Sequence, residues 1–123
     1  MRSGTVVKVA DNSGPCFLRI IKILRSHPQA TAKFGDHVVG SVLYTHQQMK
    51  FKVEKGSLVR AICIRIANSH LRSDGQRLRF QYPAVAIITK NGVPRGTKIF
   101  GPLPKELREQ GYIRLMSLGT IAL

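Results

Sequence analysis

The sequence has few acidic residues. Six Asp and Glu residues stand against 20 Lys and Arg residues in 123, which gives a formal net charge of +14 and a pI of about 10.8. A domain this basic attracts polyanions, and nucleic acid is the usual partner of such a domain. The shortage of acidic groups therefore predicts a nucleic-acid-binding protein rather than a neutral soluble one.

Cysteine is also scarce, since only Cys16 and Cys63 occur. Two cysteines are too few for a disulfide framework, and they lack the spacing of metal ligands. Each stands in an apolar run, which predicts two small buried side chains. No apolar run reaches the length of a membrane span. The sequence thus predicts no metal, no other cofactor and no membrane partner.

Groups that could carry out catalysis are missing. The four histidines are His27, His37, His46 and His70, and none has a second histidine four residues further on. The carboxylates fall in predicted turns or in one predicted helix, so no pair remains for acid–base chemistry. The glycine-rich motifs that bind nucleotides are absent. The sequence predicts a protein that is not an enzyme and has no small-molecule substrate.

Runs rich in Val and Ile, separated by glycine-containing turns, predict a mainly β fold. The predicted strands cover residues 5–9, 16–24, 38–44, 58–66, 77–80 and 84–89. The run 58–66 is almost continuously apolar, which predicts a central strand with Arg60 and Arg65 reaching outward near its ends. Short strands in a small domain must cover their edges, so we expect a closed or nearly closed β-barrel.

One short helix is predicted over residues 104–110. Pro104 suits the first turn of a helix, and Gly111 can end it. Two turns are unstable alone in water. We therefore expect this helix to dock on the barrel through its apolar neighbours, Leu103, Leu107 and Tyr112. The chain is predicted to be a single domain, with the barrel over about residues 1–102 and a helical part over about residues 103–123.

Candidate RNA-binding residues gather near turns. They form three clusters: Arg72 and Arg77 around Asp74-Gly75, Arg95 and Lys98 around Gly96, and Lys50 with Lys52 in the basic segment 46–52. Arg and Lys on rigid turns suit phosphate contacts, which fix orientation without reading sequence. The alternative for any one of them is a solvated surface charge.

Aromatic residues make up only 7% of the chain, and tryptophan is absent. Phe17, Phe34, Phe80 and Phe100 stand at positions expected in the core. Barrels that bind single strands usually display several aromatic rings for stacking. The sequence therefore favours a folded RNA recognised by shape and charge. A free-standing barrel that binds single-stranded RNA or DNA is the alternative, and a small nuclease is a third possibility.

Several motifs, in order along nearly the whole chain, resemble the large ribosomal subunit protein 14 family. They are KVADNSG at 8–14, VRAICIR at 59–65, the DG turn at 74–75, RF at 79–80, AVAII at 84–88, PRGTKIFGP at 94–102 and KELRE at 105–109. The resemblance implies a five-stranded β-barrel with a protruding β-ribbon and a short helical C-terminal part. It also implies a structural constituent of the ribosome.

The resemblance further implies contacts with large-subunit rRNA near the subunit interface, with small-subunit rRNA at an intersubunit bridge, and with large-subunit proteins 3 and 19. The RNA-facing positions that it implies are Asn12, Ser13, Arg72, Arg77, Arg79, Arg95, Gly96, Thr97 and Lys98. Arg108 and Arg114 are the implied subunit-interface residues.

Three stretches depart from the pattern of that family. Pro83 replaces a residue that is usually small and polar, residues 65–70 lack most of the expected cations, and residues 44–51 are atypical. These departures favour a mitochondrial ribosome, with a bacterial or plastid ribosome as the alternative.

Overall fold

Five strands form a closed barrel. The computed structural model describes residues 4–24, 33–45, 56–67, 70–72 and 74–122. The barrel strands are β1 (Val6–Val9), β2 (Pro15–Ile23), β3 (His37–Thr45), β4 (Leu58–Arg65) and β7 (Ala84–Ile88), in the order β1-β2-β3-β4-β7. Neighbours are antiparallel except β1 and β7, whose parallel pairing closes the barrel. The predicted mainly β, five-stranded barrel is confirmed.

Alternation along the strands fills the barrel. In β2, Leu18 and Ile20 are 0% and 1% exposed, while Phe17 and Arg19 point outward. Successive residues of a strand face opposite sides, so each turned-in residue joins one core. Burying a Val, Leu or Ile side chain contributes about 1.5–3 kcal/mol. The apolar pattern of the strands is therefore the main source of the barrel's stability.

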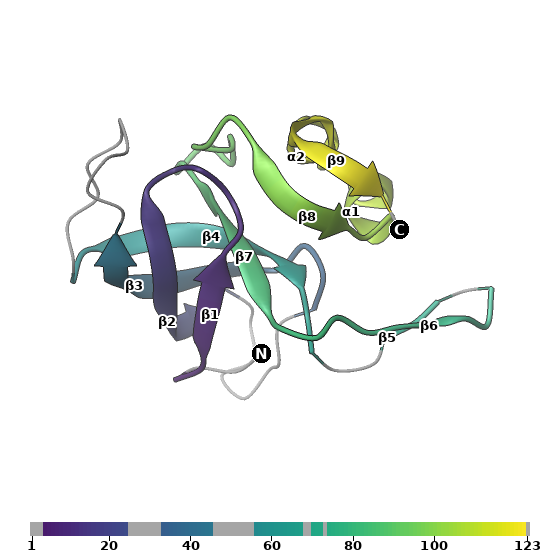
Figure 1. Ribbon diagram of the computed structural model, residues 1–123, viewed down its shortest axis with the longest axis horizontal. Coiled ribbons are helices and arrows are strands. Elements are labelled where there is room, and N and C mark those ends of the chain that lie inside the picture. Colours follow the sequence, from purple (N-terminus) through teal and green to yellow (C-terminus); the bar gives the residue numbers. More distant parts are fainter. Residues whose placement is uncertain (1–3, 25–32, 46–55, 68–69, 73, 123) are drawn as a thin grey trace.

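The protruding ribbon is a short antiparallel hairpin of β5 (His70–Leu71) and β6 (Arg77–Leu78). Figure 1 shows it running away from the barrel. The Arg72 N–H donates to the Gln76 carbonyl at 2.8 Å, and Gly75 turns the chain with a φ of +88°. The predicted strand 77–80 is shorter than expected, and it belongs to this ribbon rather than to the barrel.

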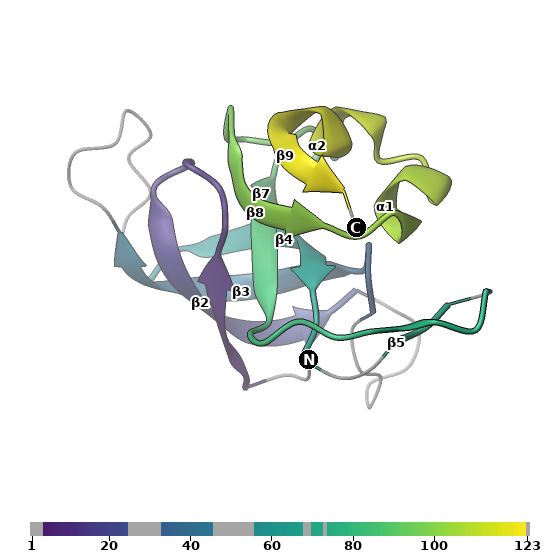
Figure 2. The ribbon, with the colours of Figure 1, turned by 45° about the vertical axis from the view of Figure 1, so that its right-hand side comes forward.

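The C-terminal part contains more structure than the sequence predicts. Helix α1 (Glu106–Glu109) confirms the predicted helix in shortened form, but β8 (Ile99–Leu103), α2 (Ile113–Leu118) and β9 (Gly119–Ala122) were not expected. Strands β8 and β9 pair in parallel. They lie with both helices over the outer face of β4 and β7 (Figures 1 and 2). The expected boundary near residue 102 falls inside β8.

A second apolar cluster joins the C-terminal part to the barrel. Leu103 and Leu107 are 1% and 0% exposed, and they pack with Ile62 and Ile64 of β4. Strand β4 also sends Ala61 and Cys63 into the barrel core, so it is buried on both faces. This explains its continuous apolar run and confirms it as a central strand. The predicted docking through Leu103, Leu107 and Tyr112 is confirmed, since Tyr112 packs against the same cluster.

Two of the four aromatic side chains expected in the core lie on the surface instead. Phe34 and Phe80 are buried and meet edge to face, with ring centroids 5.9 Å apart. Phe17 is 40% exposed and Phe100 is 57% exposed. Their predicted burial is wrong, because each follows or precedes a residue that the strand turns inward. Cys63 is buried as predicted, whereas Cys16 is only half-buried.

Candidate nucleic-acid interface

A buried carboxylate organises the loop between β1 and β2. Asp11 is 8% exposed, and its oxygens accept the Ile87 N–H at 2.8 Å, the Ser13 N–H at 3.2 Å and the Ser13 hydroxyl at 2.5 Å. Burial raises the pKa of the Asp11 carboxyl above its ordinary value, although these hydrogen bonds oppose the rise. The loop is thereby fixed to β7.

The next residue ties this loop to the stretch before β8. The Asn12 amide oxygen accepts the N–H groups of Thr97 at 2.7 Å and Lys98 at 3.1 Å, and its nitrogen donates to Thr97 Oγ1 at 2.7 Å. A Cβ at Gly96 would stand only 2.7 Å from the Asn12 oxygen. We call this arrangement, formed by Asn12 and residues 96–98, the Asn12 junction. A larger residue at position 96 would have to displace the Asn12 amide from its hydrogen bonds.

The junction changes the interpretation of two predicted RNA-facing residues. Ser13 is 0% exposed and its hydroxyl is bonded to Asp11, so its side chain holds the loop and does not face outward. The Asn12 amide is occupied by residues 97 and 98. Thr97 and Lys98 themselves are exposed. RNA contact by these exposed residues stays a prediction.

Three cations converge on a hollow at the β4–β7 side of the barrel. The hollow has a volume of about 450 Å³ and is lined by Leu58, Val59, Arg60, Ile88, Thr89, Lys90, Asn91 and Arg95. We call it the basic groove. No acidic residue is among those lining residues. Among the described residues, the three positive side chains at the hollow have no acidic side chain between them, which favours an anionic occupant.

Backbone hydrogen bonds hold the groove's turn in place. The Arg95 N–H donates to the Ile87 carbonyl at 3.0 Å, and the Thr89 N–H donates to the Val93 carbonyl at 2.9 Å. Arg95 was a predicted site residue, but Arg60 and Lys90 were not. The outward position of Arg60 on a central strand was visible in the sequence. The approach of Lys90 depends on how the turn after β7 folds back, which the sequence did not show.

Another predicted RNA-binding residue is engaged within the protein. The Arg72 guanidinium donates through Nε to Glu106 Oε1 at 2.8 Å and through Nη2 to Oε2 at 3.4 Å, and both side chains are 15% exposed. This ion pair connects the β5–β6 turn to α1. Arg77 and Arg79 are exposed on the ribbon. The structure thus gives Arg72 an architectural partner and leaves Arg77 and Arg79 open to solvent.

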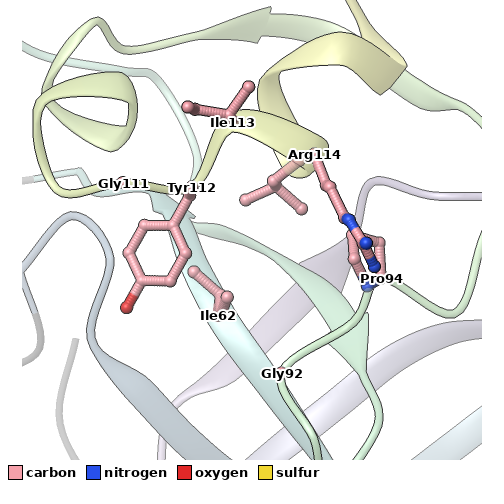
Figure 3. A pocket seen from close by; sticks show the side chains of 8 residues that line it. Ile62, Gly92, Pro94, Gly111, Tyr112, Ile113 and Arg114 are labelled. Atoms are coloured by element: carbon pink, nitrogen blue, oxygen red, sulfur yellow. The ribbon is translucent and has the colours of Figure 1, made fainter.

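The two predicted subunit-interface residues lie in different surroundings. Arg114 lines a pocket of about 320 Å³ between the C-terminal part and the barrel, together with Pro94 and Tyr112 (Figure 3). The Tyr112 hydroxyl donates to the Gly35 carbonyl at 2.9 Å and contacts His37 Nε2 at 3.2 Å. Arg108 is exposed on α1. The pocket wall is therefore held rigidly beside Arg114.

Two predicted RNA-binding residues, Lys50 and Lys52, lie outside the described residues.

The described residues also bear on metal binding and on membrane insertion. In the described ranges, no group of three or more His, Cys, Asp or Glu side chains could hold a metal ion. The same part of the chain contains no helix with the length and apolar character that a membrane crossing needs.

The closed five-stranded barrel, its clustered cations and its docked C-terminal part define a small, basic β-barrel protein. Comparison with known proteins then gives the family. The model of the family described as ribosomal protein L14p/L23e matches residues 1–123. The chain is also 40% identical over 114 residues to the large ribosomal subunit protein uL14 of Petrotoga mobilis, a match that covers 91% of this chain and 90% of the relative.

The chain therefore belongs to the ribosomal protein L14p/L23e family. It is a structural constituent of the ribosome and not an enzyme. The predicted family resemblance is confirmed over the whole chain.

Proposed function

We propose that the chain binds rRNA of the large ribosomal subunit near the subunit interface, and that the basic groove is its principal phosphate-binding surface. The observation that carries the proposal is the convergence of Arg60, Lys90 and Arg95 on one hollow, with no acidic residue among the described residues that line it. The Petrotoga mobilis relative is named as a large-subunit protein, which supports the choice of subunit.

The groove suits a phosphate backbone. Arg60 and Arg95 each carry a planar guanidinium, which can donate two parallel hydrogen bonds to a phosphate, and Lys90 adds a point charge. Arg60 comes from a central barrel strand, and the backbone of Arg95 is bonded to β7. The backbones of Arg60 and Arg95 are therefore held in place, and ordering on RNA binding is confined to the side chains.

We further propose that the C-terminal part supports a bridge to small-subunit rRNA. Arg108 and Arg114 are exposed there, and the Asn12 junction fixes the start of β8 relative to the barrel. Large-subunit proteins 3 and 19 are the proposed neighbours, on the basis of the family. A rigid connection between an rRNA-bound barrel and this part would keep the bridging cations at a set angle.

A mitochondrial ribosome is the proposed location. It is supported by the departures at Pro83 and at residues 44–51 and 65–70. Identity of 40% with a bacterial relative also fits a bacterial or plastid ribosome. Co-sedimentation with ribosomes from purified organelles, compared with those from the cytosol, decides between these locations.

The phosphate role of the groove is tested by salt dependence. Each phosphate contact contributes about 0.9 to the slope of log affinity against log salt concentration for a duplex. We expect Arg60→Ala with Arg95→Ala to weaken rRNA binding and to lower that slope by about two. Arg95→Ala with Lys98→Ala should act similarly if Lys98 also contacts phosphate.

The matched control is Lys33→Ala with Lys105→Ala, which removes the same charge. Both lysines are exposed, and neither lines the basic groove. We expect the control to change the slope by less than half as much. Equal slopes for the two double variants would show that overall charge, and not the groove, determines binding.

A further inference from the structure

The outer face of β2 and β3 carries a pair of aromatic rings at the surface. Phe17 lies opposite Tyr44 in the strand register, and their ring centroids are 6.3 Å apart at an interplanar angle of 82°. Phe17 is 40% exposed and Tyr44 is 63% exposed. Contiguous exposed apolar surface can mark a place where a partner binds, whereas single exposed apolar residues are normal.

Cations flank this pair. Lys8 of β1 lies opposite Phe17 on its other side, and Arg19 follows two residues later on the same face of β2. Both cations are exposed, and neither β1 nor β2 contains an acidic residue. The surface thus combines rings that can stack with side chains that can neutralise phosphate.

We propose that Phe17 and Tyr44 form a stacking platform for an unpaired RNA nucleotide, with Lys8 and Arg19 contacting the neighbouring phosphates. The proposal rests on the proposed function, which supplies RNA as the partner. Stacking on an aromatic side chain tolerates any base, because every base has a π-face. An apolar protein segment would instead cover Lys8 and Arg19 without satisfying their charge, which is costly.

The platform is continuous with the basic groove. Arg19 pairs with Ser41 of β3, and Ser41 pairs with Leu58 of β4, which lines the groove. Neighbouring strands are about 4.8 Å apart, so Leu58 lies about 10 Å from Arg19 across the sheet. A strand of RNA that leaves the groove can therefore reach the platform over the outer face of β3.

This arrangement extends the mode of binding expected from the sequence. Recognition by shape and charge was predicted because aromatic residues are few, tryptophan is absent, and four phenylalanines, Phe17 among them, were assigned to the core. Its exposure adds a contact that only an unpaired nucleotide can make, since a base within a duplex is already stacked on both faces. The platform should therefore distinguish bulged from fully paired RNA.

The absence of tryptophan permits a direct test. Tyr44→Trp places the only tryptophan of the chain on the platform, where it can be excited selectively, and retains an aromatic ring. The probes are a labelled RNA hairpin with a three-nucleotide bulge and a fully paired hairpin of equal length. At saturation, judged by polarisation of the label, we expect strong quenching of the tryptophan by the bulged hairpin and little by the paired one. Equal emission in the two complexes would overturn the proposal.

A second set of variants measures the contribution to affinity. Phe17→Leu with Tyr44→Leu keeps apolar surface but removes both rings, and we expect at least about a fivefold loss of affinity for the bulged hairpin. Affinity for the paired hairpin and the salt slope should not change. The control is Tyr82→Leu, because Tyr82 is 65% exposed and lies outside β1, β2 and β3. Thermal unfolding confirms that each variant is folded.

The outcomes separate this proposal from the proposed function. Loss of rRNA binding in Arg60→Ala with Arg95→Ala, together with unchanged binding of the bulged hairpin by the leucine variants, would refute the platform alone. Unchanged RNA binding in the Arg60→Ala, Arg95→Ala variant and in the leucine variants would refute both the groove and the platform. If the leucine variants bind RNA normally but fail to join a subunit that contains its proteins, the rings contact a protein, and the proposal is wrong.

Discussion

The carboxylate of Asp11 should be a major stabilising group, and Asp11→Ala tests this. The carboxylate accepts hydrogen bonds from the N–H of Ile87, which is 76 residues away in sequence, and from the N–H and the hydroxyl of Ser13. Ile87 and Ser13 are each 0% exposed, so water cannot replace the lost acceptor. A buried donor left without a partner costs about 1–3 kcal/mol. The N–H groups of Ile87 and Ser13, the two backbone donors among the three, less the relief from removing a buried charge, give an expected loss of about 3 kcal/mol.

Asp11→Asn separates the hydrogen bonds from the charge. The amide oxygen can still accept the Ile87 N–H, and the amide nitrogen can donate to the Ser13 hydroxyl oxygen. We therefore expect a smaller loss, of about 1 kcal/mol, at neutral pH. Urea unfolding with a common m-value measures both free energies. A loss below about 1 kcal/mol in Asp11→Ala would refute the claim that these donors depend on the carboxylate.

The pH dependence has a definite sign. Burial raises the pKa of Asp11 in the folded protein above its ordinary value of 3.8. The folded state then holds its proton at pH values where the unfolded state has lost it, so this group's contribution to stability falls as pH rises from 3.8 through the folded pKa. The wild type should lose stability relative to Asp11→Asn over that range. A relative gain would mean that the hydrogen bonds outweigh burial.

Three further predictions concern connections elsewhere in the fold. Gly96→Ala should cost about 1–3 kcal/mol in urea unfolding, because its Cβ would meet the β1–β2 loop at 2.7 Å; unchanged stability would show that the loop yields freely. A double-mutant cycle on Arg72 and Glu106 should give a coupling of about 1 kcal/mol, and additive losses would deny a link between ribbon and helix. Burial raises the pKa of Cys63 to about 12, so a thiol reagent at pH 8 should label it only on unfolding. Rapid labelling of Cys63 itself in the native protein, distinguished from that of the half-buried Cys16, would contradict that burial.

The barrel was predictable from the sequence, whereas most of the C-terminal part was not. Runs rich in Val and Ile mark the barrel strands in the sequence, and buried and exposed residues alternate over most of β2 and β3 in the structure. Strand β8 contains Gly101 and Pro102, which ordinarily disfavour a strand. Its pairing with β9 is made possible by the cluster around Leu103, a tertiary effect. Short elements of this kind depend on contacts that a local pattern does not contain.

Some side-chain orientations could have been predicted from the sequence, and others could not. Leu18 and Ile20 must point inward, so Phe17 shares the outer face with Arg19, and its exposure could have been predicted. The burial of Ser13 could not, because it depends on a carboxylate that also bonds to Ile87 in a distant strand. Local alternation therefore indicates which residues face outward, but not which polar residues the fold uses internally.

Backbone hydrogen bonds tie the stretch 94–102 to the barrel and, through Ile87, to the buried Asp11. The backbone N–H of Ile87 donates to Asp11, and the backbone carbonyl of Ile87 accepts the Arg95 N–H. Ile87 therefore links the buried carboxylate to one of the cations of the basic groove. Pro94 bridges to Ile88, and the Phe100 N–H donates to the Ala10 carbonyl at 2.7 Å. The stretch is thus bonded to β7 near its N-terminal end and to Ala10, the residue after β1, near its C-terminal end. A change at Asp11 should therefore displace Arg95 and weaken phosphate binding, although Asp11 itself is buried and faces no partner.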